Sequence, residues 1–584
     1  MNTPANSAAQ SAGSPWSSLD QQIQTLNAKL FSGLSPVSLA LAQMDWALNL
    51  LQTPSAQIQL QETAAQNWRQ WWLTSWQTPA EAPTDTPANT DTRFAHSTWQ
   101  RQPWASMVEA QRLQEQWWRQ ATQLRGMKPH SQEQMNFYAS KWLDMMSPSN
   151  WLATNPEAME KAMNSGGLTL VKGAQHAVRD WWKAQGQHDQ RDAPALQAGH
   201  GLAMTPGVVV ARSHLCELIQ YTPTTTKVHA EPVLIIPSCI MKYYILDLSP
   251  ENSMVKWLVA QGHTVYMVSW RNPDENDALL TMDDYVREGV LANLAHVQHT
   301  HGEDVHLMGY CLGGTFAAIA AALLQGQHNT PHHAHGLASL SLLAAETDFK
   351  EPGEMGVLID EAQVRMLEDM MAAQGFLTGP QMAGSFQFLH SRDLVWANRT
   401  KRWLLGDEDI PNDLMIWNTD LTRLPAVMHS QYLRQCFLNN NLANGNFTLD
   451  GHAVVLRNID LPVFAVGTVK DHVSPWRSVY KLHRLTSSPL TFALTNGGHN
   501  AGIISEPGHR GRHFQLHTTP ASEPRLSSEE WLEQAEQFEG SWWTAWSEWL
   551  VAHGSGRQVT ARKPPTKASL GTAPGSYVMQ RYDD

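Results

Sequence analysis

The stretch that decides the fold is VHLMGYCLGG, residues 305–314. It opens with an apolar run typical of a buried strand, and the Ala-rich segment 312–325 that follows is typical of a helix. Between them lies the pattern Gly309-x-Cys311-x-Gly313. A tight strand-to-helix turn strains the backbone of its central residue, and small residues two positions away let strand and helix approach. The turn also places the Cys311 thiol at a helix N-terminus, where the helix dipole favours a thiolate. We therefore interpret Cys311 as a nucleophile.

Two backbone amides near Cys311 are candidates for stabilising an oxyanion. The amide of Leu312 would point to the place where a negative oxygen forms during attack on a carbonyl group. A second donor is expected from the loop PSCI, residues 237–240, which follows a short apolar strand. We assign it to the amide of Ile240, and we interpret Cys239 on the same loop as a small apolar filler.

From about residue 205 the chain alternates short apolar runs with helical segments. The runs that we predict to be strands are residues 232–236, 263–270, 305–308, 337–343, 463–467 and 490–494. Ser249 and Pro250 predict the start of a helix, with serine as N-cap and proline at the first helical position. Thr281 and Asp284 predict a capping box before another helix. Such alternation predicts an α/β fold with a mostly parallel sheet.

Loops at the ends of two predicted strands supply candidate partners for Cys311. Asp471 follows the strand 463–467, and His499 follows the strand 490–494 after two glycines. Parallel strands bring their carboxyl ends to one edge of a sheet, and the order nucleophile, acid, histidine is that of an α/β-hydrolase. We assign Cys311, Asp471 and His499 as the catalytic residues.

Other residues compete for these roles or resemble them. Asp348, which follows the strand 337–343, is the alternative acid. His472 competes with His499, although its place beside Asp471 favours a structural role. Cys216 and Cys436 are interpreted as buried, inert thiols.

The pattern predicts three regions. Residues 1–200 form a helical N-terminal domain with a mobile loop at about 77–103, and residues 201–520 form the α/β-hydrolase-like domain. A helical cap insertion at about 350–455 interrupts that domain. Residues 521–584 form a Trp-rich segment and tail. Of the 25 tryptophans, 14 lie at or before Trp182; we interpret them chiefly as core residues, with contact to an apolar phase or to a partner as the alternative.

Composition excludes several classes of protein. The 41 basic and 54 acidic residues give a formal net charge of −13, and no basic run marks a nucleic-acid site. No stretch is apolar and long enough to predict a membrane span, and residues 1–16 lack the pattern of a secretory signal. Four separated cysteines exclude a disulfide scaffold and a thiolate zinc site. We expect a cytoplasmic protein without a metal site.

Several separate motifs together resemble the polyhydroxyalkanoate synthases. The segments are IIPSCIMKYYILDLSPENS (235–253), GHTVYMVSWRNPD (262–274), GYCLGG (309–314), KDHVSPW (470–476) and GGHNAGII (497–504), joined by NSGGLTLVKG (164–173) and APGSYV (573–578). The similarity runs from about residue 100 to the C-terminus. It is greatest to the class I, single-subunit form, which prefers short 3-hydroxyacyl-CoA thioesters.

The resemblance implies an acyltransferase that polymerises (R)-3-hydroxyacyl-CoA, chiefly 3-hydroxybutyryl-CoA, through an acyl-Cys311 intermediate. It implies Cys311 as nucleophile, His499 as its base, Asp471 as the third catalytic residue and Asn440 as a substrate-binding residue. It requires no cofactor, because coenzyme A is part of the substrate and a product. It also implies a homodimer at the surface of a growing polyester granule. The segment HSRDLVW (390–396) departs from the family's arginine-proline pattern, so we transfer no CoA-contacting arginine; Arg392 is a weak candidate.

Two other functions share parts of this pattern. A cysteine hydrolase or thioesterase of the same fold would also contain Gly-x-Cys-x-Gly, but would not need the long N-terminal domain. A non-enzymatic granule-associated protein would use only the Trp-rich surface.

Overall fold

The computed structural model describes residues 23, 33–76, 91–184, 196–326, 336–389, 391–408, 412–564 and 570–581. Residues 1–16 and the greater part of the loop expected at 77–103 therefore lie outside the described residues. Where that loop is described, it contains two short 3-10 helices, Thr92–Phe94 and Ser97–Gln100. This part of the loop is ordered because Phe94 and Trp99 are buried against each other, with ring centroids 5.0 Å apart.

In the described part of the chain, ten strands form one sheet in the order β17-β16-β15-β14-β9-β8-β6-β7-β4-β3. Their bounds are β3 (Gly207–Arg212), β4 (Cys216–Tyr221), β6 (Val233–Ile236), β7 (Val265–Trp270), β8 (Val305–Tyr310), β9 (Leu337–Leu343), β14 (Val463–Thr468), β15 (Leu490–Thr495), β16 (His513–Thr519) and β17 (Glu536–Glu539). The strands from β15 to β7 pair in parallel, and two strands at each edge pair antiparallel. The expected mostly parallel sheet is confirmed.

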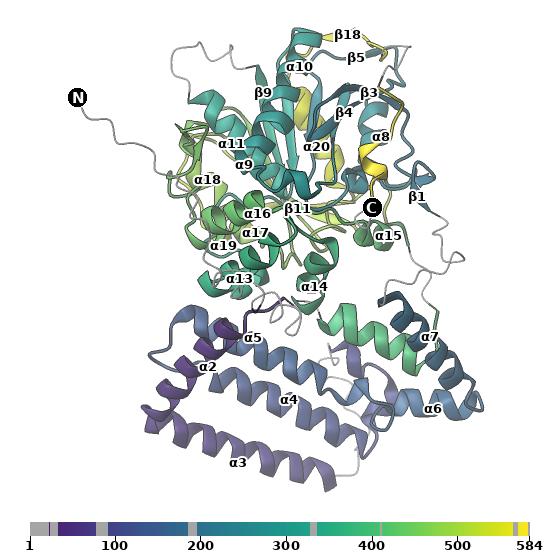
Figure 1. Ribbon diagram of the computed structural model, residues 1–584, viewed down its shortest axis with the longest axis vertical. Coiled ribbons are helices and arrows are strands. Elements are labelled where there is room, and N and C mark those ends of the chain that lie inside the picture. The colour runs from purple at the N-terminus through teal and green to yellow at the C-terminus, as the bar shows by residue number, and fades with distance from the viewer. Residues whose placement is uncertain are drawn as a thin grey trace.

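Helices cover both faces of this sheet (Figure 1). They are α8 (Met254–Ala260), α9 (Met282–Asp284), the π-helix η7 (Tyr285–Leu291), α10 (Ala292–His301), α11 (Leu312–Gln325), α17 (Trp476–Tyr480), α18 (Leu482–Leu485), α19 (Ser528–Gln534) and α20 (Trp542–Ala552). Strand β6 shows why both faces are apolar. Leu234 and Ile236 join the core beside α11, whereas Val233 and Ile235 join the core beside α8 and α20. A strand covered on both faces reads as a continuous apolar run because successive side chains point to opposite faces.

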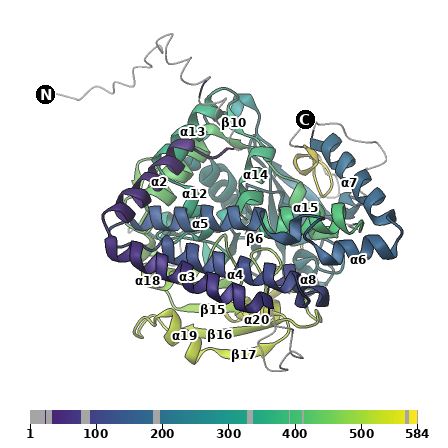
Figure 2. The same cartoon turned by 90° about the horizontal axis from the view of Figure 1, so that it is seen from below.

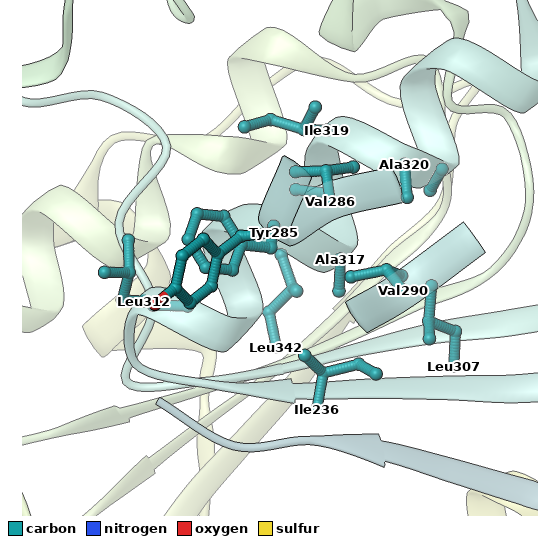
Figure 3. Packing of buried hydrophobic residues seen from close by; sticks show 14 of the residues in the cluster. Ile236, Tyr285, Val286, Val290, Leu307, Leu312, Ala317, Ile319, Ala320 and Leu342 are labelled. Carbon is teal, nitrogen blue, oxygen red and sulfur yellow. The ribbon is translucent and has the colours of Figure 1, made fainter. Parts of the chain in front are cut away.

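Figure 3 shows the core between α11 and the sheet. Ile236, Leu307 and Leu342 rise from three neighbouring strands, and Ala317 of α11 and Val290 of η7 pack onto them. The small alanines of α11 let this helix lie close to the strands, which fixes the position of its N-terminus relative to the sheet.

The predicted helix start at Ser249 is wrong. Helix α8 begins at Met254 and Ser253 is its N-cap, with its side chain accepting from the amide of Lys256. Ser249 instead lies in a turn, where its hydroxyl donates to Asn252. The capping box of Thr281 and Asp284 is confirmed.

The cap, residues 350–455, lies between β9 and β14 and is mostly helical. Its elements are α12 (Gly353–Leu358), α13 (Glu361–Ala372), α14 (Gly379–Leu389), the π-helices η9 (Ser391–Ala397), η10 (Thr400–Leu404) and η11 (Leu433–Leu438), α15 (Asp413–Thr419), α16 (Ala426–Tyr432), and the short strands β10 (Phe376–Leu377), β11 (Leu424–Pro425), β12 (Thr448–Leu449) and β13 (His452–Ala453).

The N-terminal helices form a layer beyond the cap (Figure 1), and α3, α4 and α5 run alongside one another when the molecule is seen from below, with α2 at an angle to them (Figure 2). Their bounds are α2 (Pro36–Leu51), α3 (Pro54–Trp76), α4 (Trp104–Ala121), α5 (Pro129–Met145), α6 (Pro156–Asn164) and α7 (Leu168–Ala184).

Polar bonds join this helical layer to the cap at separate places. The Ser35 amide donates to Gln363 over 2.7 Å, and the buried Asp144 accepts from Arg392 over 2.6 Å. Asp180 of α7 accepts from the indole N–H of Trp403 over 2.9 Å. These bonds all end on residues of the cap.

The tryptophans at the two ends of the chain differ in environment. Trp531, Trp542 and Trp546 are fully buried, and the Trp546 indole N–H donates to Ser341 of β9 over 2.9 Å. The segment after residue 520 therefore shares the sheet and core of the α/β domain. Several N-terminal tryptophans, among them Trp68 on α3, are instead exposed, so the interpretation as core residues is wrong for these.

The turn between β8 and α11 holds Cys311 in a left-handed conformation, with φ 53° and ψ −128°. A Cβ on Gly309 would lie 2.6 Å from the carbonyl oxygen of Gly313. A Cβ on Gly313 would lie 2.6 Å from the carbonyl carbon of Pro237, on the loop after β6. Both glycines are therefore required for strand, helix and neighbouring loop to meet.

We expect Gly309→Ala to destabilise the protein by at least about 2 kcal/mol, because backbone rather than a flexible side chain opposes the added methyl group. Thermal unfolding measures this. Gly384→Ala is the matched control, since a Cβ there meets nothing within 4 Å and alanine is the better helix former. Equal melting temperatures for the Gly309→Ala variant and the wild type would contradict the packing argument.

Candidate active site

Cys311 lies at the first turn of α11, where β8 ends, and its residue is partly exposed. Leu312, the next residue, is the first of α11, so its amide lies beside the thiol. The N-terminal amides of a helix have no partner within the helix, so this amide can donate to a group bound there. Cys311 itself donates its amide to the Leu343 carbonyl at the end of β9, over 2.9 Å. The sulfur is thus presented at the carboxyl edge of the sheet.

His499 and Asp471 meet at the same edge. The His499 Nδ1 and the Asp471 Oδ2 lie 2.9 Å apart, and their side chains are 13% and 0% exposed. With Nδ1–H donating to the carboxylate, the other ring nitrogen is left to exchange a proton with the Cys311 thiol. The ring lies beside Tyr310, the residue before the nucleophile, with centroids 5.7 Å apart.

The Asp471 carboxylate is held by several donors besides His499. Its Oδ1 accepts from the amides of Val473 and Ser474 over 2.9 and 2.8 Å, and its Oδ2 accepts from the Thr468 hydroxyl over 3.2 Å. These bonds fix the carboxyl group in position, and it orients the imidazole through His499 Nδ1.

The pKa of His499 is raised well above its usual value. Burial alone would lower it, but the charge of Asp471, the charge of Cys311 and the hydrogen bonds to both stabilise the imidazolium more strongly. The site therefore favours a protonated His499 beside Asp471 and Cys311, and a histidine paired in this way with a cysteine is the arrangement of an activated nucleophile.

The order of strands explains how distant residues meet. Cys311 follows β8, Asp471 follows β14 and His499 lies beyond β15. In the sheet, β15 and β14 are neighbours, and only β9 lies between β14 and β8. On the other side of β8 lies β6, whose following loop carries Ile240. The Ile240 amide donates to the Ser238 hydroxyl over 3.3 Å, a long bond.

The two competing residues face other partners. The Asp348 carboxylate accepts from the Lys350 amide and from the Asn440 side chain, each over 2.9 Å. His472 is exposed and lies 3.5 Å from Glu354. The structure thus places Asp471, and not Asp348, against His499.

Asn440 bridges the cap and the loop after β9. Its side-chain oxygen accepts from the Phe349 amide over 2.9 Å while its nitrogen donates to Asp348. Arg392 lies away from this point, because its guanidinium is bound to Asp144 of α5. Arg392 therefore joins the cap to the helical layer.

Glu346 is a residue near the site that the sequence reasoning missed. It is buried on the loop after β9, and burial, followed by the charges of Asp471 and Cys311, raises its pKa well above the usual value. Its position after a predicted strand was the only signal in the sequence.

The remaining cysteines are free and buried. Burial raises the pKa of the Cys239 and Cys436 thiols, which fits their interpretation as inert. Within the described ranges, no group of three or more His, Cys, Asp or Glu residues is arranged to hold a metal ion. Nor does any helix there reach the length and apolar character of a membrane span.

Three family models match the chain. Residues 14–55 match "Poly-beta-hydroxybutyrate polymerase N terminal", residues 90–258 match "Poly-beta-hydroxybutyrate polymerase (PhaC) N-terminus" and residues 232–505 match the "alpha/beta hydrolase fold".

Curated relatives match over most of their length. A poly(3-hydroxyalkanoate) polymerase subunit PhaC of Rhizobium etli is 35% identical over 498 residues, which are 84% of this chain and 77% of the relative. The chain belongs to the poly(3-hydroxyalkanoate) polymerase family. A polymerase of Methylorubrum extorquens is 36% identical, over 84% of this chain and 81% of its own. The subunit PhaC of Cupriavidus necator is 37% identical, over 77% of this chain and 76% of its own. The expected family, fold and acyltransferase class are thereby confirmed.

We expect Asp471→Asn to lower the pKa of His499, because it removes the charge that chiefly stabilises the imidazolium. A lower pKa of His499 leaves less imidazolium to stabilise the Cys311 thiolate, which is the form that iodoacetamide alkylates. Alkylation of Cys311 at neutral pH should therefore slow by at least about ten-fold, since a pKa lower by one corresponds to a ten-fold change in the protonation equilibrium. Peptide mass spectrometry measures the rate. Asp348→Asn is the control, because that carboxylate bonds Asn440 instead of His499. An equal effect of both substitutions would contradict the assignment of Asp471.

Proposed function

We propose that this polymerase is of the class I, single-subunit form and polymerises short (R)-3-hydroxyacyl-CoA, chiefly 3-hydroxybutyryl-CoA, releasing CoA through an acyl-Cys311 intermediate. The observation that carries the proposal is the contact of His499 with Asp471 at 2.9 Å, beside a cysteine at a helix N-terminus. The names of the relatives, which are poly(3-hydroxyalkanoate) polymerases, support the class of product.

In the acylation step, the Cys311 thiolate attacks the thioester carbonyl, and His499 carries the proton taken from the thiol. The developing oxyanion would be stabilised by the amides of Leu312 and Ile240; for this, the substrate oxygen must replace Ser238 at the Ile240 amide. The bond between the carbonyl carbon and the CoA sulfur then breaks, and the proton held by His499 passes to that sulfur, so coenzyme A leaves as a thiol. The exchange of one thioester for another is nearly balanced in free energy, which favours sulfur over a serine oxygen as nucleophile.

In the elongation step, a 3-hydroxyl attacks the acyl-Cys311 thioester and an oxoester forms. An alkanol needs a base near neutral pH. Asp471 is fully buried and already accepts four hydrogen bonds. This supports a mechanism in which His499 takes the proton and Asp471 acts through it.

Water would compete with the attacking hydroxyl, and we infer that the cap excludes it. Tyr432 and Phe437 of the cap pack with Phe349, with ring centroids between 5.1 and 6.0 Å. Trp417 anchors the cap by donating its indole N–H to the Lys242 carbonyl over 2.8 Å. Asn440, which ties the same part of the cap to the loop after β9, would position the substrate.

We infer that the protein works in the cytoplasm, as a homodimer at the surface of the growing polyester granule. The support is a row of tryptophans on α3. Trp68, Trp72 and Trp76 are 63%, 45% and 72% exposed, and successive rings lie 5.6 and 5.4 Å apart. Other exposed apolar residues on α2 and α3 are Leu41, Met44, Leu48, Leu51, Ile58 and Leu73. Tryptophan suits a boundary between water and an apolar phase.

Incubation with (R)-3-hydroxybutyryl-CoA tests the reaction. We expect CoA release together with insoluble polyester, and a decrease in rate with thioesters of longer chains. Cys311→Ala should lower CoA release by at least about 1,000-fold, because the nucleophile is lost. A soluble 3-hydroxy acid in place of polyester would identify a thioesterase, and absence of CoA release would favour a non-enzymatic granule protein.

Replacement of Trp68, Trp72 and Trp76 by Gln tests the granule surface. These side chains are exposed, so we expect the fold to persist and binding to isolated polyester granules to weaken by at least about ten-fold, from the loss of apolar contact area. Replacement of the exposed Trp181 and Trp182 on α7 is the matched control. Unchanged granule binding with a shift from dimer to monomer in sedimentation would instead assign the row to the subunit contact.

A further inference from the structure

Glu346 is a buried carboxyl group that the mechanism above does not use. The residue is 5% exposed, and its Oε1 is buried without a hydrogen-bond partner among the residues that the structure describes. Burying a polar oxygen without a partner costs free energy. An orphaned group of this kind in a folded protein needs an explanation.

The backbone fixes Glu346 next to the nucleophile. The Thr315 hydroxyl, in the first turn of α11, donates to the Glu346 carbonyl over 2.8 Å. Gly314 permits this approach, because a Cβ there would collide with the Cβ of Ala345. Strand β9 lies between β8 and β14, so Glu346 stands between the loops that carry Cys311 and Asp471.

The surroundings of the Glu346 side chain include the reacting groups. The charges of Asp471, Cys311 and His499 act on it, as does that of Lys481. Tyr432 and Cys436, both from the cap, interact with Glu346 in turn. The carboxyl group is thus coupled electrostatically both to the catalytic residues and to two residues of the cap. Burial and the neighbouring anions favour its neutral form, which can both donate and accept a hydrogen bond.

We propose that the Glu346 carboxyl hydrogen-bonds the 3-hydroxyl of the acyl chain on Cys311 and thereby selects hydroxylated acyl-CoA. This rests on the acyl-Cys311 mechanism proposed above. In that intermediate, C3 is two C–C bonds of about 1.5 Å each from the carbonyl carbon, so its hydroxyl stays close to the sulfur. The carbonyl oxygen would face the Ile240 loop on one side of β8, and Glu346 lies on the other side.

A hydrogen-bonding group in an otherwise apolar site discriminates strongly against a ligand that lacks the hydroxyl. An acyl chain that lacks the 3-hydroxyl displaces water from the site and leaves the buried Glu346 carboxyl group unpaired. An apolar pocket alone would accept the unsubstituted chain nearly as well as the hydroxylated one.

Acylation of Cys311 by (R)-3-hydroxybutyryl-CoA and by butyryl-CoA measures this selection. The ratio of the two single-turnover rates, read from CoA release and from the mass of the Cys311 peptide, is compared in the wild type, Glu346→Leu and Glu346→Gln. We expect the ratio to fall by about ten-fold or more in Glu346→Leu, because one buried hydrogen bond is lost. Glu346→Gln keeps a donor and an acceptor, so its ratio should stay near that of the wild type.

Thermal unfolding separates selection from a structural role. Because leucine removes an unpaired buried oxygen, we expect Glu346→Leu to melt roughly 2–4 °C higher than the wild type. A lower melting temperature or a loss of folding would show that the carboxyl is structural and would overturn the proposal, as would an unchanged ratio. If the wild type formed no acyl-Cys311 with either thioester, both the proposed function and the selection by Glu346 would be refuted. If acylation were normal and the ratio were unchanged in Glu346→Leu, only the selection would be refuted.

Discussion

The backbone strain at Cys311 is the constraint on which the rest of the site depends. A non-glycine residue with positive φ persists only where its surroundings hold it there, and here the holding groups are backbone atoms packed against glycines. Gly309, Gly313 and Gly314 remove the side chains that would separate β8, α11 and the two flanking loops. The same contacts that tolerate the strain also bring the amides, the thiol and the helix N-terminus to one point.

The charged groups of the site depend on that packing in a second way. Amide and hydroxyl donors hold the buried Asp471 carboxyl group in place, and its charge, with that of Cys311, raises the pKa of His499 well above the usual value. Glu346, only one strand away, has no hydrogen-bond partner at Oε1 among the residues that the structure describes, and burial together with the charges of Asp471 and Cys311 raises its pKa well above the usual value. Two neighbouring carboxyl groups thus differ in their hydrogen-bond partners.

The sequence was sufficient where a local pattern and a sheet edge together determine the outcome. The turn at Cys311, the capping box at Thr281 and the meeting of Asp471 with His499 follow from motifs at strand ends. Where a prediction from the sequence was wrong, tertiary packing determined the observed structure. Ser249 followed by proline matches the N-cap pattern, but the packed helix begins at Met254 with Ser253 as its N-cap.

The burial of individual side chains was the property that could least be predicted from the sequence. Trp542, Trp543 and Trp546 of α20 are buried while Trp68, Trp72 and Trp76 of α3 are exposed, although both helices are rich in tryptophan. Nothing in the local sequence around Glu346 indicates that its side chain is enclosed. The π-helices of the cap, such as η11, were also not predicted, because a helical period in the sequence does not separate π-helix from α-helix.

The attachment of the helical layer has a consequence for building chimeric enzymes. Ser35, Asp144 and Asp180 bind partners in the cap, at Gln363, Arg392 and Trp403, and Gly173 of α7 leaves room for the backbone of Trp403. An exchange of the N-terminal helices alone between two relatives would split these matched pairs and leave the buried Asp144 facing a foreign surface. Recombination that keeps both members of each pair must transfer the helices and residues 350–455 as one module, although the sequence separates them by the first half of the sheet.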